Sequence, residues 1–260
     1  MPELKIGVHL PSLRLPLDRA IALAAKLGAD AIEIDARHQL KPADLSQTAV
    51  RQLRKMLSDQ RLRVCSVAFR TRRGYETLQD LDARVAGTKA AMRMAQALGA
   101  TVVVNHVGNI PAKAEGTEWN LLLQVLTDLG RDGQRIGALL AAQTGHSGGD
   151  DLKRLIEALP DGSLGVDLDP GQLIVNGQSA SEAVEVLGQH ILHVHATDGV
   201  RDLARGRGLE VPLGRGSVDY PVLLGALEEH GYRGYFTVQR DAAGDPETEI
   251  GQAVKYLRSL

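Results

Sequence analysis

The sequence predicts a single (β/α)8 TIM barrel that spans residues 1–260 as one domain, and three observations lead to this prediction. Short apolar, β-branched segments alternate with longer amphipathic segments along the whole chain. Because a helix separates each strand from the next, neighbouring strands must run parallel. The alternation repeats eight times, and eight parallel strands close into a barrel. The length of 260 residues also suits one such barrel.

The expected strands are short apolar segments, and they cover Leu4–His9, Ala31–Ile34, Arg63–Phe69, Thr101–Asn105, Gly137–Ala142, Gly165–Leu168, Ile191–Ala196 and Gly234–Val238. The expected helices are amphipathic, and they cover Leu17–Leu27, Ser46–Leu57, Leu78–Leu98, Trp119–Leu129, Asp150–Ala158, Ser179–Leu187, Tyr220–His230 and Pro246–Leu257. The periodicity of Gly137–Ala142 fits a strand or a helix, and its place in the alternation favours a strand. An open doubly wound sheet is the alternative, but the segment HLPSLRLP after the first strand contains no glycine-rich phosphate loop.

Composition narrows the class of protein. The net charge of −2 gives no overall basic field to hold nucleic acid. The chain has one cysteine, Cys65, so no disulfide can form within it, which fits a reducing compartment. We find no signal peptide at the start and no run of 18 apolar residues, so we expect a cytoplasmic protein that does not enter a membrane.

Polar side chains stand at the predicted carboxyl end of every strand, where the active site of such a barrel lies. In strand order they are His9; Glu33 and Asp35; Arg70, Arg72 and Arg73; Asn105 and His106; Gln143; Asp167, Asp169 and Gln172; His193, His195 and Asp198; and Gln239, Arg240 and Asp241. A packing scaffold would not need polar groups at all eight ends. The pattern therefore predicts a ligand-binding mouth.

Several segments together resemble one family. They are KIGVHL, LAAKLGADAIEID, AQALGATVVVNHVG, GVDLDPGQL, ILHVHATDG and VPLGRGSVDYPVLLGALEEHGYRGYFTV. The chain resembles, over nearly its whole length, the sugar phosphate isomerase/epimerase superfamily of xylose isomerase-like barrels. That superfamily includes ketose 3-epimerases, inosose dehydratases and endonuclease IV-type repair enzymes.

The resemblance implies a divalent metal, such as Mn, Mg or Zn, held by a glutamate, an aspartate, a histidine and a second glutamate. Carried over by position, the aspartate is Asp169 and the histidine is His195, but Gln143 and Gln239 stand where the glutamates would be. The set loses two negative charges, so we expect weakened metal binding. In the epimerases the two glutamates are also thought to transfer the proton, and glutamine does not titrate.

Other mouth residues complete the expected site. His106 is a candidate catalytic residue beside Gln143 and Gln239, and His9, Glu33, Asp35 and Asp198 also remain open as replacement bases. The substrate-binding candidates are His9, Arg72, Gln172, Asp198 and Arg215. Asp198 is also a candidate to orient His195.

Three functions follow from these observations. The preferred one is an isomerase or epimerase acting on a sugar, polyol or related carbonyl compound. The alternative is a non-catalytic carbohydrate-binding or scaffold relative, because glutamine amides suit sugar hydroxyls. A DNA-repair endonuclease is third, since the expected cluster for several zinc ions is incomplete. The expected partner is a small carbohydrate-like ligand, and relatives are often homo-oligomers.

Overall fold

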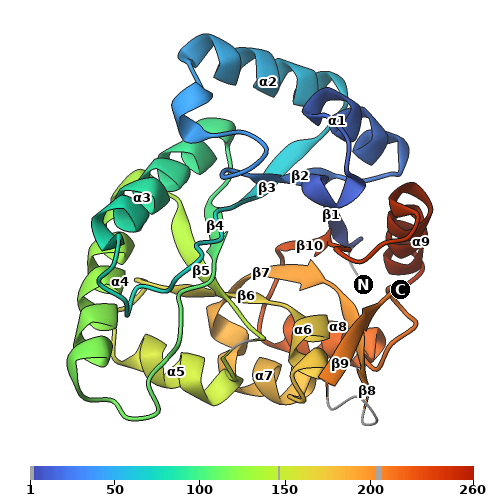
Figure 1. Cartoon of the computed structure of the whole chain (residues 1–260). Coiled ribbons are helices and arrows are strands. Elements are labelled where there is room, and N and C mark those ends of the chain that lie inside the picture. Colours follow the sequence, from blue (N-terminus) through green and yellow to red (C-terminus); the bar gives the residue numbers. More distant parts are fainter. Residues whose placement is uncertain (1–2, 146, 203–206) are drawn as a thin grey trace.

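The structure, a computed structural model, describes residues 3–145, 147–202 and 207–260. Its centre is a closed barrel of parallel strands (Figure 1). The strands, in chain order, are β1 (Lys5–His9), β2 (Ala31–Asp35), β3 (Arg63–Ala68), β4 (Val102–Asn105), β5 (Leu139–Gln143), β6 (Gly165–Leu168), β7 (Ile191–Ala196) and β10 (Tyr235–Val238). The predicted fold class is confirmed. The open-sheet alternative is wrong, because β1 pairs with both β2 and β10.

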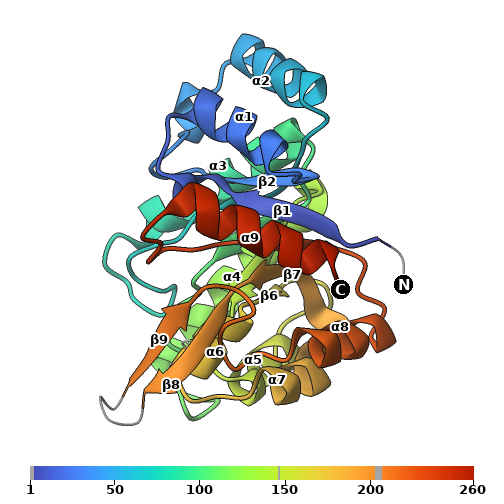
Figure 2. The ribbon, with the colours of Figure 1, turned by 90° about the vertical axis from the view of Figure 1, so that its right-hand side faces the viewer.

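Helices cover the outside of the barrel (Figures 1 and 2). They are α1 (Leu17–Lys26), α2 (Gln47–Asp59), α3 (Leu81–Leu98), α4 (Thr117–Ile136), α5 (Gly149–Glu157), α7 (Ala180–Leu187), α8 (Tyr220–Glu229) and α9 (Pro246–Arg258). All eight predicted helices are present with shifted ends. None of the helices in the described ranges is long and apolar enough to cross a membrane.

Three kinds of element lie outside the predicted alternation. The short helix α6 (Pro170–Val175) follows β6, and its N-cap Asp169 accepts a hydrogen bond from the Gln172 amide. The strands β8 (Asp198–Asp202) and β9 (Arg207–Val211) form an antiparallel hairpin beyond the barrel mouth (Figure 2). Single 3-10 turns cover Leu10–Leu13, Pro42–Asp44 and Gly188–His190. Sequence analysis missed the hairpin because its strands are short and carry charged residues and glycines.

Strand register brings polar side chains from neighbouring strands into one interior layer. His9 is level with Glu33, Asp167 with His193, and Thr237 with His195. Pairing slips by one residue between Ile32 and Glu33 and between Val166 and Asp167. Such irregularities change which way a strand side chain points.

Two side chains of the barrel interior approach the backbone of Gly7 closely. A Cβ atom on Gly7 would lie 2.5 Å from Thr237 Oγ1 and 3.0 Å from Cys65 Sγ. These distances leave no room for a side chain, so only glycine at this position lets Thr237 of the neighbouring strand β10 and Cys65 of β3 pack beside β1.

The buried carboxylate of Asp198 fixes the loop at the base of the hairpin. Its Oδ1 accepts hydrogen bonds from the amides of Gly199 and Val218, at 2.9 and 3.1 Å. Its Oδ2 accepts from the amides of Gly214 and Gly216, at 3.0 and 2.8 Å. Arg215 is therefore held in an organised turn.

We expect Asp198→Ala to destabilise the fold by about 3 kcal/mol, because it leaves several partly buried amides without an acceptor. Asp198→Asn keeps one acceptor oxygen and should lose about half as much. Urea unfolding followed by circular dichroism measures both values. The exposed Asp44→Ala is the control and should stay within about 0.5 kcal/mol of the parent. An Asp198→Ala value as small as the control would contradict this role.

Candidate functional site

A cavity of about 300 Å³ opens at the carboxyl ends of the strands. Its walls come from the ends of β3, β4, β5, β6 and β10 and from α6. The lining residues are Arg70, His106, Gln143, Thr144, Gly145, Asp169, Gln172, Asn176, Gln239 and Asp241. This is the mouth that the polar strand ends predict.

The structure brings together five of the predicted site residues, since His106, Gln143, Asp169, Gln172 and Gln239 all line this cavity. It places four others outside the lining. Arg72 and Arg215 are exposed, and His9 and Asp198 are buried. These four residues do not line the cavity, and their substrate-binding roles stay predictions.

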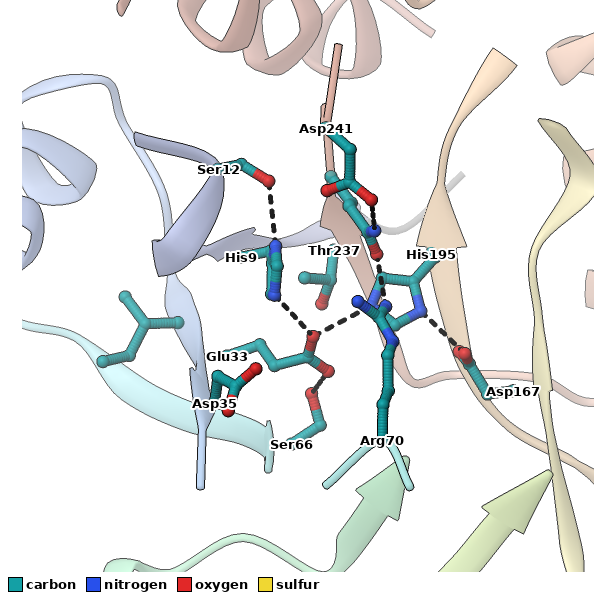
Figure 3. Close-up of polar contacts among 12 residues, drawn as sticks. His9, Ser12, Glu33, Asp35, Ser66, Arg70, Asp167, His195, Thr237 and Asp241 are labelled. Atoms are coloured by element: carbon teal, nitrogen blue, oxygen red, sulfur yellow. Dashed lines mark hydrogen bonds and ion pairs between the residues drawn. The ribbon is translucent and has the colours of Figure 1, made fainter. Parts of the chain in front are cut away.

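A continuous chain of hydrogen bonds crosses the mouth, with Arg70 at its centre; Figure 3 shows the part of it that runs from Arg70 to Asp241. The Arg70 guanidinium donates from Nε to Gln143 Oε1 at 3.2 Å and from an Nη atom to Gln239 Oε1 at 2.7 Å. Gln143 Nε2 then donates to Asp169 at 3.0 Å, and Gln239 Nε2 donates to Asp241 at 2.9 Å. We call this series, Asp169–Gln143–Arg70–Gln239–Asp241, the mouth chain.

The mouth chain explains why amides stand at positions 143 and 239. Each of these side chains accepts a hydrogen bond from Arg70 and donates one to a carboxylate. Only an amide has both an acceptor oxygen and a donor nitrogen at the same end. A glutamate at either position could accept from Arg70, but it would repel the neighbouring aspartate.

The backbone around Arg70 is held on both sides. Its carbonyl oxygen accepts a hydrogen bond from the Arg37 guanidinium at 2.8 Å. The next residue, Thr71, donates from its hydroxyl to Asn105 at 3.1 Å, and the Asn105 amide nitrogen donates to the buried Tyr75 hydroxyl at 2.8 Å. The guanidinium therefore projects from a fixed point at the end of β3.

Both carboxylate oxygens of Asp169 accept hydrogen bonds. Its Oδ1 accepts from the Gln172 amide and from the Thr197 hydroxyl, and its Oδ2 accepts from Gln143. Burial raises the pKa of Asp169 to about 6, against the attraction of His195. These contacts use Asp169 as the cap of α6 and as one end of the mouth chain.

Below the mouth, His195 lies between two carboxylates. Its Nδ1 is 2.7 Å from Asp167 and its Nε2 is 2.9 Å from Glu33 (Figure 3). Between two carboxylates the ring is placed to donate from both nitrogens, as an imidazolium does. Burial opposes this charge, but attraction to Asp167 and Glu33 raises the pKa of His195 well above its usual value. Asp198 does not orient His195, contrary to the sequence prediction, because its carboxylate is bonded to the loop amides.

His193 belongs to the same interior cluster. Its Nδ1 donates to Asp167 at 2.8 Å, and its Nε2 is 3.1 Å from the hydroxyl of Ser66. Ser66 donates its own proton to Glu33 at 2.6 Å, so it can only accept from His193. Burial works against the charged ring, but the hydrogen bond to Asp167 prevails and the pKa of His193 is raised to about 9.

The interior cluster is therefore balanced in charge, with two imidazoliums facing two carboxylates. Burial acts to raise the pKa values of Glu33 and Asp167, but the charged rings lower both pKa values below their usual range. His9 adds no charge to this cluster. Burial lowers its pKa to about 4, so the ring is neutral, and its Nδ1 bonds to Ser12 at 2.8 Å.

The residues at the family's metal position do not fit a divalent ion as they are arranged. A ligand must offer a lone pair to the ion. His195 presents N–H groups on both sides, and the oxygens of Gln143 and Gln239 accept from a cation, Arg70. Asp169 is bonded as described above.

A second group of ligand atoms lies deeper in the barrel. Glu33, His193 and His195 offer atoms that are all within 4.8 Å of one another. In the structure these atoms are joined by protons, to each other or to Asp167, Ser66 and Thr237. An ion there would have to displace protons from both rings.

Comparison with known proteins shows the family of the chain. Residues 21–260 match the family described as the xylose isomerase-like TIM barrel. The chain belongs to this family. No curated protein matches the chain.

Solved structures share the fold. A xylose isomerase domain protein from Planctomyces limnophilus superposes with a TM-score of 0.86 at 23% identity, covering 99% of this chain and 96% of that one. A xylose isomerase-like TIM barrel protein from Mycobacterium smegmatis, in complex with magnesium, gives 0.78 at 18%, covering 99% and 96%. A D-allulose 3-epimerase from a Methylomonas species, in complex with D-allulose, gives 0.75 at 19%, covering 99% and 97%.

Sequence reasoning named Arg70 only as one of three arginines after the third strand and did not include it among the site residues. A signal for its role was present in the sequence. The two glutamines that replace two acids keep oxygens that can accept hydrogen bonds from a cation. Glu33 was considered only as a base, whereas the structure makes it a partner of His195.

We expect Asp167→Asn to destabilise the fold by about 3 kcal/mol, because it removes one carboxylate from a buried, balanced cluster and leaves two imidazoliums facing one acid. Thermal and urea unfolding measure the loss. Asp161→Asn, an exposed change in the loop before the same strand, is the matched control. Equal stability of both variants would show that the cluster is not charged.

Proposed function

We propose that this protein is a sugar isomerase/epimerase-like enzyme that binds a sugar, polyol or related carbonyl compound at the mouth of the barrel. The observation that carries the proposal is the cavity of about 300 Å³, which is lined by amides, carboxylates, a guanidinium and an imidazole. Side chains of these types pair with hydroxyl and carbonyl oxygens. A cavity of this size suits a small molecule.

Relatives support the class of ligand. Solved structures of this fold include a D-allulose 3-epimerase with D-allulose and a D-psicose 3-epimerase with D-fructose. Low sequence identity to them means that the individual sugar must be found by experiment. The amides at positions 143 and 239 require a proton-transfer group different from a glutamate pair.

His106 is the proposed proton-transfer group. It is half-buried, lies just after β4 and lines the cavity. The two carboxylates of the lining, Asp169 and Asp241, each accept from an amide of the mouth chain. An imidazole can act as a general base, which is the role that removal of a proton beside a carbonyl requires.

Exchange of the substrate's carbon-bound hydrogen with solvent tests this function. The protein is incubated with a panel of ketoses in deuterium oxide, and NMR follows deuterium at the carbon beside the carbonyl. We expect one or more ketoses to exchange, and His106→Gln to slow exchange by about a hundredfold. His38→Gln, an exposed histidine outside the cavity lining, should leave the rate unchanged.

The outcomes separate the two leading functions. An unchanged rate in His106→Gln would remove that residue from the mechanism. Binding of a sugar without exchange of any panel member would instead support the non-catalytic carbohydrate-binding alternative, which the neutral amides also suit.

A second test asks whether ligand binds in this cavity. Gln172 lines the cavity and Arg72 does not, although both are substrate-binding candidates from sequence. Gln172→Ala should weaken binding of the best panel sugar by about fivefold to tenfold, the effect of one lost hydrogen bond. Arg72→Ala should have no effect. Calorimetric titration gives both values, and the reverse order would place the ligand elsewhere.

A further inference from the structure

Arg70 occupies the place between the two amide oxygens at which the family's metal would be bound. Its guanidinium lies 3.2 Å from Gln143 Oε1 and 2.7 Å from Gln239 Oε1, so both amide oxygens already face a positive charge. These contacts link β5 and β10 across the mouth through a side chain from the end of β3.

The positive charge of Arg70 is not neutralised by its contacts. Both of its amide partners are neutral, and within the described ranges of the chain no carboxylate lies within ion-pair distance of it. The two nearby acids, Asp169 and Asp241, are each bonded to an amide instead. An arginine keeps its charge at any ordinary pH.

The charge is also accessible. Arg70 is half-buried, and it lines the cavity together with His106 and Gln172. A guanidinium in a partly desolvated pocket attracts an anionic oxygen far more strongly than it attracts a hydroxyl. The same charge repels a second cation placed next to it.

We propose that Arg70 serves as the built-in cation of the mouth in place of a divalent metal, and that it selects ligands with an anionic oxygen, from a carboxylate or a phosphate. This inference rests on the proposed function, because it names the ligand class of the same cavity. The amides at positions 143 and 239 are then adapted to hold a guanidinium rather than being remnants of a metal site.

Manganese titration tests the first half without any sugar. We compare the parent protein, the double variant Gln143→Glu with Gln239→Glu, and the triple variant that adds Arg70→Met. The parent should bind no stoichiometric Mn²⁺. In the double variant the new carboxylates should pair with Arg70, so affinity should remain low. The triple variant should bind Mn²⁺ at least about a hundredfold more tightly than the double variant.

Two results would overturn the first half. One is stoichiometric Mn²⁺ binding by the parent that is lost in Asp169→Ala. The other is a double variant that binds Mn²⁺ as tightly as the triple variant. Circular dichroism and thermal unfolding establish that each variant is folded, and if the triple variant is not, Arg70→Met alone is titrated with the anionic probes below.

Matched probes test the second half. D-gluconate, D-glucitol 6-phosphate and D-glucitol have the same carbon chain length and differ in whether they carry a carboxylate, a phosphate or neither. Calorimetry or ligand-observed NMR should give at least about tenfold tighter binding for one of the anions than for D-glucitol. The anion that is preferred identifies the source of the anionic oxygen. Arg70→Met should reduce the preference to within about threefold, whereas Arg70→Lys should retain part of it.

The two proposals can fail separately. If D-glucitol binds as tightly as both anions, or if the preference survives in Arg70→Met, ligand selection by Arg70 is wrong while the sugar-binding cavity stands. If none of the three probes and none of the ketoses binds, the proposed function is wrong, and the manganese titration alone decides the role of Arg70.

Discussion

The structure depends on keeping four ionised side chains in balance inside the barrel. His193 and His195 each face Asp167, and His195 also faces Glu33, all of them shielded from water. Removing charge from water costs free energy that only close, opposite partners can offset. The strands must therefore keep the register that brings these partners together. The same demand fixes His195 as a cation and takes it away from the role of a metal ligand.

The charged interior cluster also affects which ions the mouth above it can bind. Directly above a protonated His195, a divalent ion would meet an adjacent positive charge, and the mouth chain carries a second one in Arg70. The glutamines suit this environment because each can accept from Arg70 and donate to an aspartate. The two amides and Arg70 therefore belong together. The amides on two strands bind the guanidinium that comes from a third.

Particular residues show how far sequence reasoning reached. Polar strand ends located the mouth, where the cavity opens. His193 and His195, both on β7, lie with their rings 4.8 Å apart. Asp169, which the family resemblance places among the metal ligands, caps α6. Asp198 was misplaced as a partner of His195, because its partners are amides 16 to 20 residues further along the chain, which no local pattern links to it. Arg72 and Arg215 are exposed and lie outside the cavity lining, and charge in a sequence does not tell exposure.

The sequence by itself determined the barrel, since hydrophobic periodicity and the alternation of segments are local properties that each stretch of chain expresses on its own. It also determined which residue types stand at each strand end. Only the tertiary structure decided which of them touch. The pairing of Arg70 with Gln143 and Gln239 joins residues 73 and 169 positions apart, and the protonation of His195 depends on acids contributed by β2 and β6. Such contacts follow from strand register and barrel closure, which set distances that no spacing along the chain encodes.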